Sequence, residues 1–127
     1  MTSEAIKVLL VEDDPLFTKL VTTMLHAKGC KVHSEPLAEA ALDKLEAETV
    51  DLLITDLRME GLGGVGLIQT LIADDSFSRR RILVITGEAP NSEESVWVAA
   101  QGIPILRKPF TVKTLFDAVD SIVAANH

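Results

Sequence analysis

The chain has 127 residues, a length that predicts one compact domain, residues 1–127, with one hydrophobic core. Hydrophobic residues make up 47% and charged residues 24% of it, a balance that excludes a disordered composition. The formal net charge of −7 argues against direct nucleic-acid binding, because phosphate contacts need clustered Lys and Arg.

Five runs of strand length divide the chain. They occupy residues 6–11, 31–35, 51–55, 82–86 and 103–107. The first is a short apolar run, which is typical of a strand buried on both faces of a sheet. The second run is the weakest of the strand patterns.

Helical spacing of apolar residues fills the segments between and after these runs. The first helix is predicted to begin at Pro15, after an Asp14 N-cap, and to end near Gly29. The fourth is predicted over residues 90–101, and Thr111 is predicted to cap the last. The apolar positions of the second, third and fifth helices are Ala38, Ala41, Leu42, Leu45, Val65, Ile68, Leu71, Ile72, Leu115, Val119, Ile122 and Val123.

Strict alternation of strands and helices predicts right-handed βαβ units. The expected fold class is therefore α/β, a doubly wound five-stranded parallel sheet with five helices on its two faces. Ligands of such sheets bind beyond the carboxyl ends of the strands, where the strand order reverses. The first and third strands are the expected neighbours at that point.

Polar side chains follow or close four of these strands. Glu12 and Asp13 follow the first strand, Asp56 follows the third, Thr86 closes the fourth and Lys108 follows the fifth. In a parallel sheet these ends lie at one edge, so three carboxylates, a hydroxyl and an ammonium should converge there. This combination suits a divalent cation and a phosphoryl group.

The acidic residues predict a magnesium site. Clustered carboxylates repel one another, and a hard cation relieves the repulsion. Mg²⁺ fits best because it takes an octahedral oxygen shell and retains waters. We expect Asp13 and Asp56 to be direct ligands, Glu12 to act through water, and the backbone carbonyl of Arg58 to complete the protein's share.

The remaining groups predict phosphoryl transfer onto a carboxylate. Lys108 is a compact charge on a flexible stem, and Thr86 adds a hydroxyl donor. With Mg²⁺ they would surround the oxygens of a phosphoryl group, whose transfer needs mainly positioning and charge neutralisation. Because carboxylates act as nucleophiles in such reactions, Asp56 is the expected covalent acceptor.

Residues 61–66 read GLGGVG and match a dinucleotide-binding pattern. That reading is rejected because the pattern starts five residues after the strand and because Asp56 and Glu60 would repel phosphates. We interpret these glycines as a flexible loop beside the phosphoryl site.

The single cysteine, Cys30, excludes an intramolecular disulfide and a thiolate metal cluster. The apolar stretches fall short of the about 20 residues that a membrane span needs. The N-terminal residues place an acid before the first apolar run, unlike a signal peptide. We therefore expect a cytoplasmic protein without membrane insertion.

As a set, these motifs resemble the receiver domain of two-component response regulators. The resemblance rests on LLVEDDP at residues 9–15, ITDLRM at residues 54–59, VITG at residues 84–87 and LRKPF at residues 106–110. It covers nearly the whole chain. It implies a flavodoxin-like fold with strand order 2-1-3-4-5 and a cis peptide bond between Lys108 and Pro109.

The resemblance also implies Mg²⁺-dependent phosphoryl transfer to Asp56 from a histidine kinase or a histidine phosphotransfer protein, followed by self-catalysed dephosphorylation. The chain would then be a signalling module rather than a turnover enzyme, acting on an output partner that the sequence does not identify. Residues 102–110, GIPILRKPF, further look like receivers fused to hybrid histidine kinases. Glu60, Gly63 and Ile105 depart from the common receiver pattern, and these departures concern how phosphorylation is read out.

Two alternatives stand beside this interpretation. A metal-dependent phosphohydrolase similar to the haloacid dehalogenases would need a second acid two residues after the nucleophile, where this chain has Arg58. A phosphorylation-independent pseudo-receiver would require loss of an acid, the threonine or the lysine, and the chain retains all of them.

Overall fold

The computed structural model describes residues 5–59 and 61–126. Within them, five parallel strands form one sheet in the order β2-β1-β3-β4-β5, which confirms the predicted α/β fold and strand order. The strands are β1 (Lys7–Val11), β2 (Lys31–Glu35), β3 (Leu52–Thr55), β4 (Ile82–Thr86) and β5 (Ile105–Arg107).

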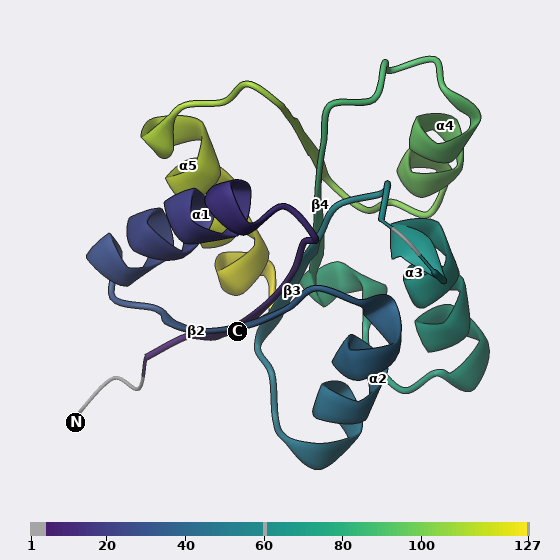
Figure 1. Cartoon of the computed structure of the whole chain (residues 1–127), viewed down its shortest axis with the longest axis horizontal. Helices are drawn as coiled ribbons and strands as arrows, with labels where there is room; N and C mark the ends of the chain where they lie inside the picture. The colour runs from purple at the N-terminus through teal and green to yellow at the C-terminus, as the bar shows by residue number, and fades with distance from the viewer. Residues whose placement is uncertain (1–4, 60, 127) are drawn as a thin grey trace.

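Helices cover both faces of the sheet (Figure 1). They are α1 (Pro15–Ala27), α2 (Ala38–Ala47), α3 (Gly63–Asp74), α4 (Glu93–Ala100) and α5 (Val112–Ala125), with a short 3₁₀ helix, η1 (Arg79–Arg81). Helices α1 and α5 pack on one face, and α2, α3 and α4 pack on the other. None of these described helices is long and apolar enough to cross a bilayer.

The alternation of side chains along β1 explains the two-sided core. Leu9 and Val11 pack into the cluster beneath α2, α3 and α4, whereas Val8 and Leu10 pack into the cluster beneath α1 and α5. Both faces are thus removed from water, which is why the strand pattern is continuously apolar. In β3 and β4 every residue is buried for the same reason.

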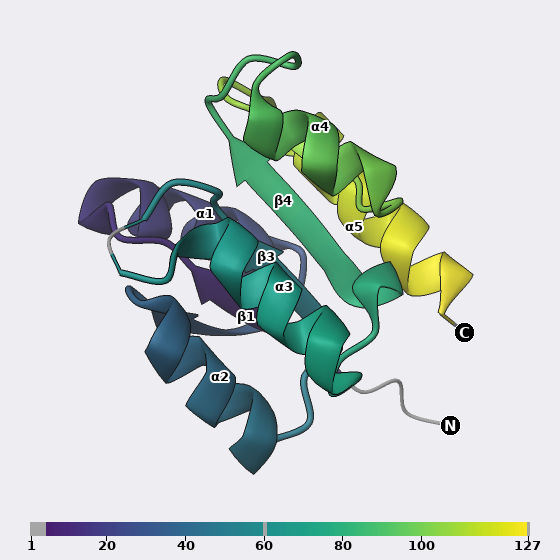
Figure 2. The same cartoon turned by 90° about the vertical axis from the view of Figure 1, so that its right-hand side faces the viewer.

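The strand register brings the carboxyl ends together. Val11 pairs with Thr55, Thr55 pairs with Val84, and Thr86 pairs with Arg107. Figure 2 shows the arrowheads of β1 and β4 pointing to the same edge of the sheet. The residues that follow these strands therefore leave the sheet side by side.

The predicted helix ends of α1 are confirmed. The Asp14 side chain accepts hydrogen bonds from the backbone N–H groups of Leu16 and Phe17, at 3.0 and 3.4 Å. At the other end Gly29 has a φ of +94°, and the N–H of Cys30 reaches back to the carbonyl of Leu25 at 3.0 Å. This is a Schellman motif, in which glycine supplies the left-handed residue.

Some predicted boundaries shift by one or two residues. Helix α4 begins at Glu93 instead of residue 90, because the Ser92 side chain accepts from the N–H of Ser95 and so caps the helix there. Strand β5 begins at Ile105 instead of residue 103, and β1 and β3 each begin one residue later than predicted. The predicted Thr111 cap of α5 is confirmed, with a reciprocal hydrogen bond to Thr114.

The interpretation of residues 61–66 as a flexible loop was wrong for the later glycines. Gly63, Gly64 and Gly66 lie in the first turn and a half of α3. A Cβ on Gly64 would stand 1.9 Å from the carbonyl oxygen of Asp56 and 2.9 Å from the Cα of Leu57. The absence of a side chain therefore lets α3 pack directly against the backbone of Asp56.

This packing makes Gly64 a sensitive position. Gly64→Ala should lower the free energy of unfolding by about 1–3 kcal/mol, since the new methyl group meets backbone atoms that cannot rotate away. Chemical denaturation measures the loss. Gly87→Ala is the matched control, because a Cβ there meets no atom within 4 Å; an equal loss in both variants would contradict the packing argument.

Candidate functional site

Backbone hydrogen bonds continue past the strand ends and fix the residues that follow. The N–H of Glu12 donates to the carbonyl of Glu35 at 3.1 Å, and the N–H of Asp56 donates to the carbonyl of Val11 at 3.2 Å. On the other side, the N–H of Lys108 donates to the carbonyl of Thr86 at 2.8 Å. The strand ends thus carry their polar side chains to one edge.

Lys108 joins two carboxylates from different strands. Its ammonium Nζ lies 2.7 Å from Oδ2 of Asp56 and 3.1 Å from Oε1 of Glu12. Both acids are buried, with Glu12 5% and Asp56 8% exposed. The structure therefore brings together Glu12, Asp56 and Lys108, as the sequence predicted.

Backbone amides hold the second oxygen of each carboxylate. The N–H of Arg58 donates to Oδ1 of Asp56 at 3.2 Å. The N–H groups of Asp13 and Asp14 donate to Oε2 of Glu12, at 3.0 and 3.3 Å. Because charged acceptors form the stronger hydrogen bonds, these donors fix the orientation of both acids.

The electrostatics of the site follow from burial and pairing. Burial raises the pKa of Glu12, and the nearby charge of Asp56 raises it further, against the lowering effect of Lys108. Burial alone would lower the pKa of the Lys108 ammonium, but hydrogen bonds and charge from Asp56 and Glu12 outweigh it and raise this pKa. The lysine therefore stays protonated between two acids.

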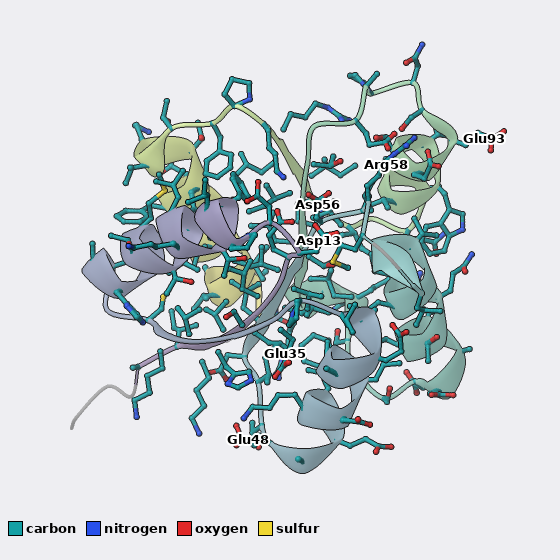
Figure 3. All side chains as sticks on the ribbon, viewed as in Figure 1. Asp13, Glu35, Glu48, Asp56, Arg58 and Glu93 are labelled. Atoms are coloured by element: carbon teal, nitrogen blue, oxygen red, sulfur yellow. The ribbon has the colours of Figure 1, made fainter. Side chains whose placement is uncertain are left out.

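Asp13 and Thr86 occupy opposite situations. Asp13 is exposed, and Figure 3 places its label beside Asp56 in the middle of the molecule. Thr86 is only 1% exposed, and its Oγ1 accepts a hydrogen bond from the N–H of Glu88 at 3.0 Å. That bond uses an oxygen lone pair, so the hydroxyl proton remains available as a donor.

The chemistry of the donor set fits a hard divalent cation. Glu12, Asp13 and Asp56 offer carboxylate oxygens at one sheet edge, and Mg²⁺ prefers oxygen ligands. Lys108 already neutralises two of these acids, so the edge is built for positive charge. In the part of the chain that the structure describes, no three His, Cys, Asp or Glu side chains form a ready-made metal cluster.

Two residues of the site region escaped the sequence analysis. Glu88 forms an ion pair with Arg58, while its backbone carbonyl accepts from Nη1 of Arg107 at 2.6 Å. The same Arg107 nitrogen lies 3.4 Å from Oγ of Ser95 in α4. Strand alternation places Arg107 on the same face of β5 as Ile105, toward α4, and this was the available signal.

The peptide bond between Lys108 and Pro109 is cis, as predicted from the resemblance. Ile105 is partly buried and packs against the cluster beneath α2, α3 and α4, together with Trp97 of α4.

Comparison with known proteins places these features in a family. The family model described as the response regulator receiver domain matches residues 8–120. The heme response regulator HssR of Staphylococcus epidermidis is 30% identical over 118 residues, which are 93% of this chain and 51% of that protein. The chain therefore spans about half the length of the curated relatives it matches.

Solved structures agree with this match. A response regulator receiver protein from Pseudomonas putida has 29% identity and a TM-score of 0.82, with 94% of this chain and 99% of that chain covered. The chemotaxis response regulator CheY4 of Vibrio cholerae has 25% identity and a TM-score of 0.82, at the same coverage.

Removing the lysine charge should destabilise the metal-free protein. Lys108→Met leaves two buried carboxylates without their partner and should cost about 1–3 kcal/mol of unfolding free energy at pH 7. The pKa of Glu12 is raised, so this acid takes up a proton at a pH above its ordinary value of 4.5. The loss should therefore shrink as the pH falls toward about 5.

Denaturant titrations at several pH values measure this trend. Lys113→Met is the control, because Lys113 pairs with Asp117 on the surface of α5 with 83% of its side chain exposed. A loss for Lys108→Met that is no larger than the control's, or that grows as the pH falls, would show that the buried pairing is misassigned.

Proposed function

The chain belongs to the response regulator receiver family, and on that basis we propose that it accepts a phosphoryl group from phosphohistidine onto Asp56. It then acts as a two-component signalling module, and its only reactions are its own phosphorylation and dephosphorylation. The observation that carries the proposal is the Lys108 ammonium, 2.7 Å from the buried Asp56 carboxylate at the carboxyl edge of the sheet.

In the proposed reaction, an Asp56 carboxylate oxygen attacks phosphorus. The bond between phosphorus and the imidazole nitrogen of the donor breaks, and its electron pair stays on that nitrogen, which regains a proton from solvent. The Lys108 ammonium changes partner from the carboxylate to a phosphoryl oxygen. The Thr86 hydroxyl donates a hydrogen bond to another phosphoryl oxygen, which requires the loop after β4 to move toward Asp56.

Asp13, Asp56 and the backbone carbonyl of Arg58 would hold Mg²⁺ directly, and Glu12 would hold it through water. When bound, the ion would supply charge neutralisation for the phosphoryl oxygens. Glu12 suits an indirect role because one of its oxygens already accepts two backbone N–H groups.

The signal ends when water attacks the phosphorus of the acyl phosphate and releases inorganic phosphate and free Asp56. A phosphohydrolase with a rapid cycle would need a general acid near Asp56. The corresponding position holds Arg58, whose side chain is paired with Glu88. A pseudo-receiver is also disfavoured, because the acids, the threonine and the lysine are all present.

The expected donor is a histidine kinase or a histidine phosphotransfer protein. Because the chain corresponds to about half of the regulators it matches, the output partner lies outside the proposal. A place within a hybrid histidine kinase and a cytoplasmic location remain predictions from the sequence.

Asp56 should be the sole acceptor. Incubation with Mg²⁺ and a small phosphodonor should add one phosphoryl group to the wild type, and Asp56→Asn should take none, as measured by intact mass. Asp75→Asn, in the exposed turn after α3, serves as a control that should still accept the group. Stoichiometric labelling of the Asp56→Asn variant would refute the assignment.

Mg²⁺ should stabilise the folded chain, because the acids are gathered only in the native state. At ten times its dissociation constant the ion should add about 1.4 kcal/mol to the free energy of unfolding. Asp13→Ala should abolish most of this gain, whereas Asp43→Ala on the exposed surface of α2 should retain it. A wild-type melting temperature that does not respond to saturating Mg²⁺ would count against the metal site.

A further inference from the structure

A third group contacts the Lys108 ammonium besides the two carboxylates. The centroid of the Phe17 ring lies 3.9 Å from Nζ, well inside the roughly 6 Å within which a cation is attracted to an aromatic face. We propose that Phe17 is a positioning residue, which holds the ammonium of Lys108 against its ring and keeps it aimed at the acceptor oxygen. This inference rests on the proposed function of Asp56.

The lysine needs such support because its stem is flexible. Its side chain is 27% exposed, so solvent reaches part of it and competes for the ammonium. The carboxylate contacts alone come from the far side of the site, where Asp56 and Glu12 lie at the ends of β3 and β1. A ring face adds attraction without a hydrogen bond that the ammonium would have to break.

The ring itself is held in place from two directions. Its backbone N–H lies in the first turn of α1, where the Asp14 side chain accepts from it. The ring meets Phe110 edge-on, with centroids 5.9 Å apart and an interplanar angle of 88°, a favourable aromatic arrangement. Phe110 follows Lys108 by two residues, so α1 and the segment after β5 are locked together around the lysine.

This contact has a specific use during phosphoryl transfer. The ammonium must leave the carboxylate oxygen and move to a phosphoryl oxygen attached to it. The carboxylate contacts change in that step, whereas the contact with the neutral ring can persist throughout. Phe17 thus keeps the charge at the reacting end of Asp56 while its anionic partners change.

Fluorinated phenylalanines at position 17 test the idea with little change of shape. One, two and three ring fluorines progressively weaken the attraction of the ring face for a cation. The initial rate of phosphorylation by a small phosphodonor should fall stepwise, by about fivefold across the series. The same series at Phe110 is the matched control and should leave the rate flat. A flat series at position 17, or an equal decline at both positions, would overturn the proposal.

A second measurement does not depend on phosphorylation. The ε-methylene protons of Lys108 should resonate upfield because of the nearby ring, and Phe17→Leu should return them to an ordinary position. Phe17→Trp, which keeps an aromatic face, should retain the upfield shift and the phosphorylation rate. Unmoved resonances in Phe17→Leu refute the contact even if the rates change. Wild type with the shift but without phosphorylation would instead refute the proposed function alone.

Discussion

The charge interaction between Lys108, Asp56 and Glu12 is the constraint on which the site depends. Two carboxylates are buried at one sheet edge, and buried charges are costly unless they are paired. Strand β5 is separated from β3 by β4, so the lysine must reach across the end of an intervening strand. Neighbouring strands lie about 4.8 Å apart, a spacing that only a long side chain spans. The need for a lysine thus follows from the strand order.

The sequence predicted what is set by chain-local chemistry and by the rules of parallel sheets. Asp14, Pro15 and Gly29 carry capping signals that act within a few residues, and each lies at the helix end where it was expected. The meeting of Glu12, Asp56 and Lys108 followed from strand ends alone, because the direction of parallel strands fixes the edge. The roles of these residues in catalysis and metal binding are still predictions.

What the sequence did not reveal depends on contacts between distant segments. The glycines at residues 63–66 have no local preference for a helix, and only the approach of α3 to the Asp56 backbone explains Gly64. The start of α4 depended on which of several polar residues caps it, and Ser92 does so. Neither Glu88 nor Phe17 belongs to a motif, since their contacts arise from folding partners 30 or more residues away.

The position of Glu88 has a consequence for the cooperativity of the loop after β4. Its N–H, its carbonyl and its carboxylate are engaged with Thr86, Arg107 and Arg58 respectively. These three contacts share one residue, so a displacement of Glu88 disturbs all of them together. Since Arg107 also reaches Ser95, the first turn of α4 is joined to the same group. A loop tied in this way favours two discrete arrangements over a continuous range, as an all-or-none response requires.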